Sequence, residues 1–147
     1  MPRMIKPRLT KETMGKAKQL TVWIADGSAE LGRVSRTLAN SEINVTAFSY
    51  QLGTGNSPLR LQVNQHAKTR EILQNLGLRV TEEEVLRVTV PDKPGTLAEI
   101  SARLVEGGIG VEYGYGAWTS KSKKADLVLA VSDLEGAERM LRNLKIA

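Results

Sequence analysis

The fold is decided by the stretch LRVTVPDKPGTLAEI, residues 86–100. Its first five residues alternate leucine or valine with other residues, which is the period of a half-buried β-strand. Its last residues begin a stripe of apolar side chains with helical spacing: Leu97, Ile100 and Leu104. A Pro-Gly pair separates the two patterns, and Thr96 and Glu99 have the spacing of a helix capping box. We therefore expect a strand, a short loop and a capped helix.

The same pattern occurs earlier in the chain. When the sequence is shifted by 66 residues, LTVWIAD at residues 20–26 falls on LRVTVPD at residues 86–92. The match continues through apolar pairs: Leu31 with Leu97, Val34 with Ile100, Leu38 with Leu104, Ile43 with Ile109, and Val45 with Val111. Leu61 and Val63 then match Leu127 and Leu129, and a two-residue slip follows before the next helix. A repeat of this length is one supersecondary unit, so the chain contains two copies of it.

The pattern of apolar residues in each copy predicts the element order βαββαβ. After the first strand and helix we expect a hairpin and a second helix in both copies: strands at residues 43–52 and 57–65 with a helix at 67–76, and strands at 109–119 and 125–131 with a helix at 134–144. Residues 78–81 form the fourth strand of the first copy. The prediction is an α+β fold of two ferredoxin-like units with antiparallel sheets, at residues 19–84 and 85–147, after a flexible basic arm at 1–18. Glu82 to Glu84 are interpreted as a solvated linker.

The second copy lacks residues for a fourth strand, because only three residues follow its second helix. An open sheet edge must be covered. We expect a strand supplied by another chain, in a dimer or by exchange. Two alternatives remain open: the N-terminal arm fills the gap, or the sequence is shortened.

Composition narrows the possible functions. The chain has 41% hydrophobic and 25% charged residues, no cysteine, and no apolar run long enough to cross a membrane. Six basic residues and one acidic residue precede Gln19, whereas fifteen of each follow, so the net charge of +5 belongs to the arm. These features predict a cytoplasmic protein without disulfides, and they give no support to a basic nucleic-acid-binding face.

A family resemblance follows from these residues. The stretch VPDKPGTLAEI at residues 90–100, its amphipathic helix and GGIGV at 107–111 resemble the ACT domain. Two such copies resemble the small tandem ACT proteins. The resemblance implies a regulatory protein that binds an amino acid at the loops between first strand and first helix and at unit interfaces. From the open sheet edge we expect a homodimer, and the residues themselves indicate no cofactor and no metal. In the first copy DGSAEL at residues 26–31 lacks the Pro-Gly pair.

The candidate ligand-binding residues lie mainly on these two loops. They are Asp92, Lys93, Pro94, Gly95, Thr96 and Leu97, then Asp26, Gly27, Ser28, Ala29, Glu30 and Leu31, with Asn44 and Tyr113 on the predicted second strands. Unpaired N–H groups at a helix start favour a carboxylate, and Gly95 allows close approach. The alternative is that Pro94 and Gly95 only turn the chain. The aromatic residues of the second strands form either a pocket wall or core packing, with Gly114 and Gly116 open to another surface.

Other functional classes receive less support. An RNA-recognition motif shares the element order but needs aromatic residues on its third strand, where this chain has LRLQV at residues 59–63 and LVLAV at 127–131. An enzyme is not expected, because His66 is the only histidine and no zinc-ligand spacing occurs. A dimerisation or assembly module without ligand remains the alternative to the amino-acid sensor. The ligand and the regulated target cannot be read from the sequence.

Overall fold

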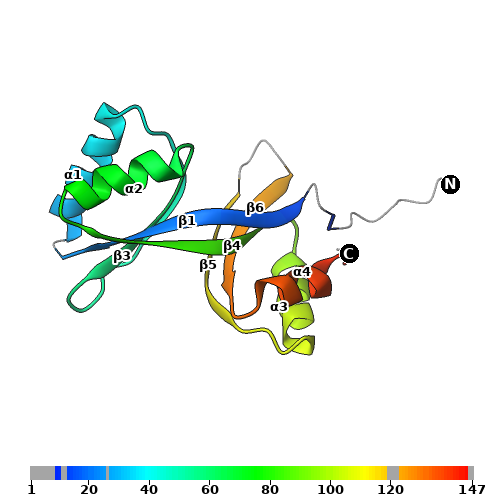
Figure 1. Ribbon diagram of the computed structural model, residues 1–147. Helices are drawn as coiled ribbons and strands as arrows, with labels where there is room; N and C mark the ends of the chain where they lie inside the picture. Colours follow the sequence, from blue (N-terminus) through cyan, green and yellow to red (C-terminus); the bar gives the residue numbers. More distant parts are fainter. Residues whose placement is uncertain (1–8, 11–12, 26, 119–122, 146–147) are drawn as a thin grey trace. The chain divides into compact units, whose positions relative to one another are not determined.

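The computed structural model describes residues 9–10, 13–25, 27–118 and 123–145. Six strands and four helices follow one another along these residues (Figure 1). In chain order they are β1 (Met14–Ile24), α1 (Gly27–Asn40), β2 (Val45–Tyr50), β3 (Ser57–Val63), α2 (His66–Asn75), β4 (Arg79–Pro91), α3 (Thr96–Glu106), β5 (Val111–Trp118), β6 (Lys124–Val131) and α4 (Leu134–Leu141). Within the described ranges, no helix has the length and apolarity needed to cross a bilayer.

The chain divides into two compact units, each with its own hydrophobic core. The first unit is Lys18–Glu83, and the second unit comprises Glu84–Ala147 together with Met1–Ala17. The strand order is β2-β3-β1-β4 in the first unit and β1-β4-β6-β5 in the second. One end of β1 and one end of β4 therefore belong to the first unit, and their other ends belong to the second. The predicted α+β fold of two ferredoxin-like units with antiparallel strands is confirmed.

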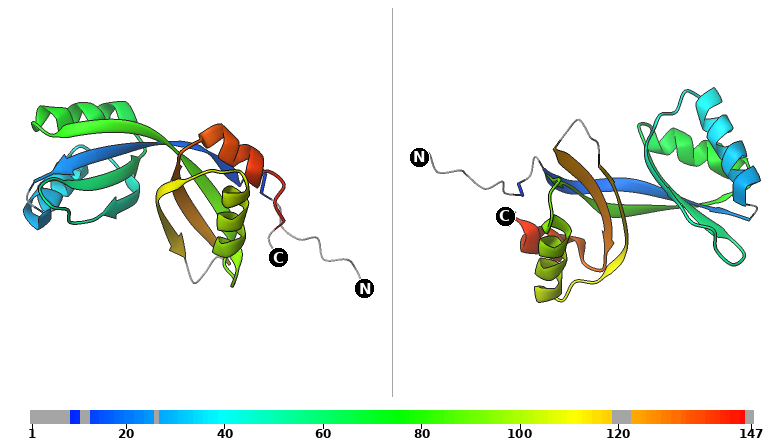
Figure 2. Two further views of the ribbon diagram at one scale, coloured as in Figure 1. Left: turned by 90° about the horizontal axis from the view of Figure 1, so that it is seen from below. Right: turned by 180° about the vertical axis from the view of Figure 1, so that it is seen from behind.

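The core of the first unit lies between its strands and its two helices. Alternate residues of β1, namely Leu20, Val22 and Ile24, are fully buried, and Leu20 lies opposite Leu61 of β3. Figures 1 and 2 show α1 and α2 on the same side of these strands. The helices bury their apolar stripes against this face: Val34 and Leu38 from α1, and Leu73 from α2. The apolar residues that recur every second position in the strand and every third or fourth position in the helices thus pack together in one core.

The fourth strand of the second unit comes from this chain itself. The backbone N–H of Thr89 in β4 donates a 2.7 Å hydrogen bond to the carbonyl of Thr13, and the beginning of β1 continues this pairing. Met14 is only 7% exposed and belongs to the hydrophobic core of the second unit. The N-terminal segment therefore supplies the missing strand of the second unit, which is one of the arrangements that the sequence left open. The expectation of a strand from another chain is wrong at this edge of the sheet.

Leu9 anchors this N-terminal segment to the second unit. Its side chain is 2% exposed within the core. Its N–H donates to the carbonyl of Leu144 at 3.2 Å, and its carbonyl accepts from the N–H of Asn143 at 2.9 Å. The expectation of a flexible arm is therefore wrong for Leu9 and for residues 14–18, because buried leucine and methionine side chains and a hydrogen-bonded backbone hold them in place.

The three consecutive glutamates do not form a turn. Residues 82–84 lie in the middle of β4, which runs without interruption for 13 residues. Glu82 forms ion pairs with Lys18 at 3.7 Å and Arg70 at 3.4 Å, and Glu83 accepts a 2.7 Å hydrogen bond from the hydroxyl of Thr21. Partners on neighbouring elements thus allow a charged run to adopt strand geometry, which the linker interpretation did not foresee.

The strand register corrects the alignment of the two copies. Leu20 lies opposite Leu61, and its equivalent Leu86 lies opposite Leu129. Leu61 therefore corresponds to Leu129 and not to Leu127, so the two-residue slip occurs in the hairpin and not after it.

The corrected register also fixes which residues of the outer strands are equivalent. Phe48 lies opposite Leu61, and Gly114 lies opposite Leu129. Phe48 and Gly114 are therefore equivalent, as are the residues two positions further along, Tyr50 and Gly116.

Candidate functional site

The loop between β4 and α3 is a tightly bonded turn. The N–H of Asp92 donates to the carbonyl of Lys123 at 2.8 Å, and the N–H of Thr96 donates to the carbonyl of Lys93 at 3.4 Å. Gly95 has a φ of +93°, a conformation that side chains disfavour, and a Cβ placed there would meet no atom within 4 Å. The glycine is thus required by backbone geometry, and the space beside it is open.

Helix α3 begins without a side-chain cap. Its N-cap residue is Gly95, and Thr96 is the first helical residue. The buried hydroxyl of Thr96 donates to the carbonyl of Pro91 at 3.0 Å, so the predicted capping box is wrong. The N–H of Glu99 donates to the carbonyl of Gly95. Among the described residues, nothing accepts a hydrogen bond from the N–H groups of Leu97 and Ala98, which leaves two donors at the helix start.

A groove of about 350 Å³ lies between α3 and β5 of the second unit. Most of its surface is apolar. Its lining comes from three elements: Leu97, Ile100, Ser101 and Leu104 of α3, Val111, Gly114, Tyr115 and Gly116 of β5, and Leu127 and Leu129 of β6. Among the predicted ligand residues, Leu97 is the one that lines this groove, and it is 55% exposed. The predicted loop therefore leads directly into an open apolar groove.

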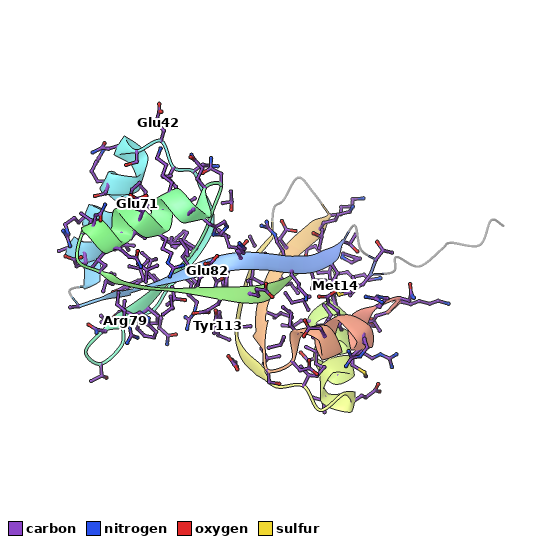
Figure 3. All side chains as sticks on the ribbon, viewed as in Figure 1. Met14, Glu42, Glu71, Arg79, Glu82 and Tyr113 are labelled. Atoms are coloured by element: carbon purple, nitrogen blue, oxygen red, sulfur yellow. The ribbon has the colours of Figure 1, made fainter. Side chains whose placement is uncertain are left out.

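The two faces of β5 differ in side-chain size. Tyr113 and Tyr115 pack against a small cluster on the sheet formed by Val85, Val128 and Ala130. The glycines lie opposite the leucines of the main core, and a Cβ on Gly114 would come within 2.9 Å of Leu129. Tyr113, labelled in Figure 3, is thus packed against the sheet and does not line the groove. The tyrosines provide packing, and the opening predicted beside the glycines is the groove.

The candidate residues of the first unit lie in a helix and not in a loop. Asp26 lies outside the described residues, whereas the candidates from Gly27 to Leu31 belong to the first turns of α1. Ser28 and Ala29 are exposed, Glu30 forms an ion pair with Arg33 at 3.1 Å, and Leu31 packs against the core. The described residues of the first unit therefore contain no counterpart of the Pro94-Gly95 turn.

Two further residues of the first unit have structural contacts. The N–H of Asn44 donates to the side-chain oxygen of Asn64 at 3.1 Å, and the N–H of Asn64 donates to the carbonyl of Asn44 at 3.2 Å. Asn44 thus joins the beginning of β2 to the end of β3. A Cβ on Gly27 would lie 3.1 Å from the hydroxyl of Tyr50, so this ring occupies the space at the start of α1.

Sequence reasoning missed a polar cleft of about 250 Å³ in the first unit. Lys18, His66, Ala67, Arg70, Glu71, Gln74 and Glu82 line it, and Figure 3 labels Glu71 on α2 and Glu82 on β4. The Nδ1 atom of His66 is buried and has no hydrogen-bond partner within the described structure. Both basic and acidic side chains line this cleft, and Glu82 already pairs with two of the basic ones. The sequence signal was weak because these residues come from three separate elements.

The described residues contain no cluster of three or more histidine, cysteine, aspartate or glutamate side chains that could hold a metal ion. The site that the structure assembles best is therefore the one in the second unit, where a glycine turn, two unpaired backbone donors and an apolar groove occur together.

Comparisons with known proteins identify the family. The profile of the ACT domain pair matches residues 15–143. A comparison with curated proteins gives no match. Among solved structures, protein BT0572 from Bacteroides thetaiotaomicron has a TM-score of 0.80 at 26% identity, over 87% of this chain and 88% of that chain.

Regulatory chains share the fold at lower identity. The ligand-free regulatory subunit of aspartate kinase from Thermus thermophilus has a TM-score of 0.64 at 15% identity, over 93% of this chain and 95% of that chain. The corresponding subunit from Thermus flavus has the same TM-score and identity, over 92% of this chain and 97% of that chain. At this identity the similarity shows the fold alone, but the family profile covers nearly the whole chain. The chain belongs to the family of ACT domain pairs.

Proposed function

We propose that this chain is a regulatory protein that binds a free amino acid at its second unit and catalyses no reaction. The observation that carries the proposal is the start of α3, where the N–H groups of Leu97 and Ala98 have no acceptor among the described residues. A carboxylate is favoured at such a position by hydrogen bonding and by the helix dipole. The left-handed turn at Gly95 leaves room for the ligand.

The remaining loop residues support recognition of a zwitterion. Asp92 is exposed beside the turn, so its carboxylate is available to an ammonium group. Pro94 limits the motion of the loop. Membership of the ACT domain pair family and the fold shared with a regulatory subunit of aspartate kinase support a regulatory role. Regulation follows if the ligand has unequal affinity for two conformations or assemblies of the protein.

The test is a thermal-shift screen of the common amino acids on the full chain, followed by calorimetry. A ligand at 100 times its dissociation constant stabilises the folded state by about 2.7 kcal/mol. Ala98→Pro removes one N–H donor from the first turn, where proline does not interrupt an intrahelical hydrogen bond. The matched control Ala98→Ser keeps the N–H.

We expect Ala98→Pro to weaken amino-acid binding and Ala98→Ser to leave it unchanged, with both proteins folded by circular dichroism. Binding that is equal in the two variants contradicts the placement of the carboxylate. If no amino acid binds the wild type at millimolar concentration, the sensor proposal is wrong.

An assembly role has support from a separate observation. Edge strand β2 and the loop after it expose apolar side chains in the first unit: Val45 is 37% exposed, Phe48 62% and Leu52 72%. Exposed apolar groups on an edge strand, which has one side without a neighbouring strand, favour contact with another chain. We infer that the protein forms a homodimer through this strand, with or without ligand.

A further inference from the structure

We propose that the groove between α3 and β5 binds the aliphatic side chain of a free amino acid, of the kind found in leucine, isoleucine, valine or methionine, and that only the second unit has this site. The inference rests on the proposed function and adds the class of ligand and the number of sites. Its basis is the shape of the groove, its chemistry and a comparison of the two units.

The groove exists because an edge strand has glycines at two successive positions on its helix-facing side. Gly114 lies opposite Leu129, and Gly116 lies opposite Leu127, and both leucines belong to the core that packs beneath the helices. Leu129 packs closely against Gly114, where a Cβ would come within 2.9 Å of it, and neither glycine adds a side chain of β5 to the space between the strand and α3. Figures 1 and 2 show α3 and α4 on the same side of β5 and β6. The result is an opening of about 350 Å³, at the low end of the roughly 300–1,000 Å³ typical of small-molecule sites.

The lining of the groove selects against polar side chains. Its base is formed by Ile100, Leu104, Leu127 and Leu129, all buried, and Leu97 lies at the edge near the Gly95 turn. Ser101 and Tyr115 are the only described lining residues with a polar side chain, the tyrosine ring packs against the other face of the sheet, and none of the lining residues is charged. A charged ligand side chain would lose hydration there without gaining an ion pair. An aliphatic side chain gains free energy from burial.

The first unit has aromatic residues at the strand positions where the second unit has the two glycines of the groove. Phe48 and Tyr50 are equivalent to Gly114 and Gly116 by strand register. Tyr50 packs against the core of the first unit, with its hydroxyl close to Gly27 at the start of α1. The chain's own apolar ring thus fills the place that is open in the second unit. This contrast predicts an apolar occupant for the groove and one ligand per chain.

The experiment is calorimetric titration of the full chain with leucine, isoleucine, valine and methionine, and with serine, threonine, aspartate and lysine for comparison. Ser101→Phe places a ring in the groove from an exposed helical position. Ala102→Phe is the matched control, because Ala102 is exposed on the same helix and does not line the groove. Gly116→Tyr is a second groove-filling variant, which copies the residue of the first unit.

We expect binding of an aliphatic amino acid with one site per chain. Ser101→Phe and Gly116→Tyr should reduce affinity by about ten- to a hundred-fold, the contribution of one buried aliphatic side chain, while Ala102→Phe should not. If a polar amino acid binds and Ser101→Phe has no effect, this inference is overturned and the proposed function stands. Two sites per chain also overturn it, as does a change of oligomeric state in Ser101→Phe without loss of affinity. If no amino acid binds, both proposals are wrong.

Discussion

The backbone N–H of Thr89 donates a 2.7 Å hydrogen bond to the carbonyl of Thr13, a residue that precedes the whole first unit in the sequence. The second unit is therefore completed by residues from the other end of the chain. Its stability depends on a segment whose local sequence gives little sign of a strand. The first unit, by contrast, is a continuous stretch of sequence.

Substitution of Leu9 should destabilise the second unit selectively. Leu9→Ala removes a side chain that is 2% exposed in the core of that unit, which typically costs about 2–5 kcal/mol. The measurement is hydrogen exchange by mass spectrometry, comparing peptides from β6 with peptides from β3. We expect faster exchange in β6 alone.

Val105→Ala is the control for this experiment, because it also shortens an aliphatic side chain to alanine, at a position that is 76% exposed and outside the proposed dimer surface. Its exchange should resemble that of the wild type. Equal loss of protection in β3 and β6 after Leu9→Ala would show that the segment does not belong to the second unit alone.

An exposed ion pair links the same segment to α4. The Nζ atom of Lys16 donates to Oε1 of Glu135 at 2.8 Å. This hydrogen bond raises the pKa of Lys16 and lowers the pKa of Glu135. The contribution of Glu135 to stability is present above its unfolded-state pKa and is lost as pH falls through its folded-state pKa. The contribution of Lys16 is present below its unfolded-state pKa and is lost as pH rises through its folded-state pKa.

A carboxyl NMR titration should therefore give Glu135 a midpoint below the usual range of glutamate. Lys16→Met should return that midpoint toward the usual range, whereas Lys145→Met, at another exposed lysine, should not change it. The effect on global stability should be small, since both side chains of the pair are exposed. An unchanged Glu135 midpoint in Lys16→Met would contradict the pairing.

Local periodicity was sufficient to predict most elements, because each helix and strand carries its own apolar pattern. The stripe of Val34 and Leu38 and the alternation of Leu20, Val22 and Ile24 correspond to buried faces in the structure. The beginning of β1 was missed because its sequence, MGKAK, has two charged residues and few apolar ones. No local pattern specifies that this segment pairs with β4 of the second unit.

The candidate site was predicted in part. The Pro94-Gly95 turn and the close approach of another surface at Gly114 followed from the residues themselves, since a left-handed turn and a close contact on a strand both favour glycine. The apolar character of the groove could not be predicted, because it depends on the register that places Leu127 and Leu129 opposite the glycines. The capping prediction failed because the hydroxyl of Thr96 bonds back to Pro91.

The guanidinium of Arg79 lies over the ring of Trp23, with its Cζ atom 4.7 Å from the ring centroid. Both residues belong to the first unit, and Figure 3 labels Arg79. A cation over an indole at a partly exposed site contributes about 0.5–1 kcal/mol. Arg79→Ala should lower stability by this amount and alter the tryptophan emission spectrum. Arg36→Ala, at an exposed position on α1, is the control and should change neither. An unaltered emission spectrum in Arg79→Ala would contradict the contact.

The edge strand β2 gives the last prediction. Phe48 is 62% exposed although it lies opposite the core residue Leu61, so an apolar ring is accessible on the edge strand of the first unit's sheet. If this strand is the homodimer contact, Phe48→Glu introduces a charge into an apolar interface and leaves the core unchanged. We expect sedimentation equilibrium to show a dimer for the wild type and a monomer for Phe48→Glu.

Val105→Glu provides the comparison, because Val105 is also an exposed apolar residue, at 76%, but lies on α3 of the second unit. It should remain a dimer. Calorimetry on the monomeric Phe48→Glu protein then separates assembly from ligand binding. Retained affinity for an amino acid places the binding site within one chain, as the groove between α3 and β5 predicts. Loss of binding together with the dimer would mean that a second chain completes the site.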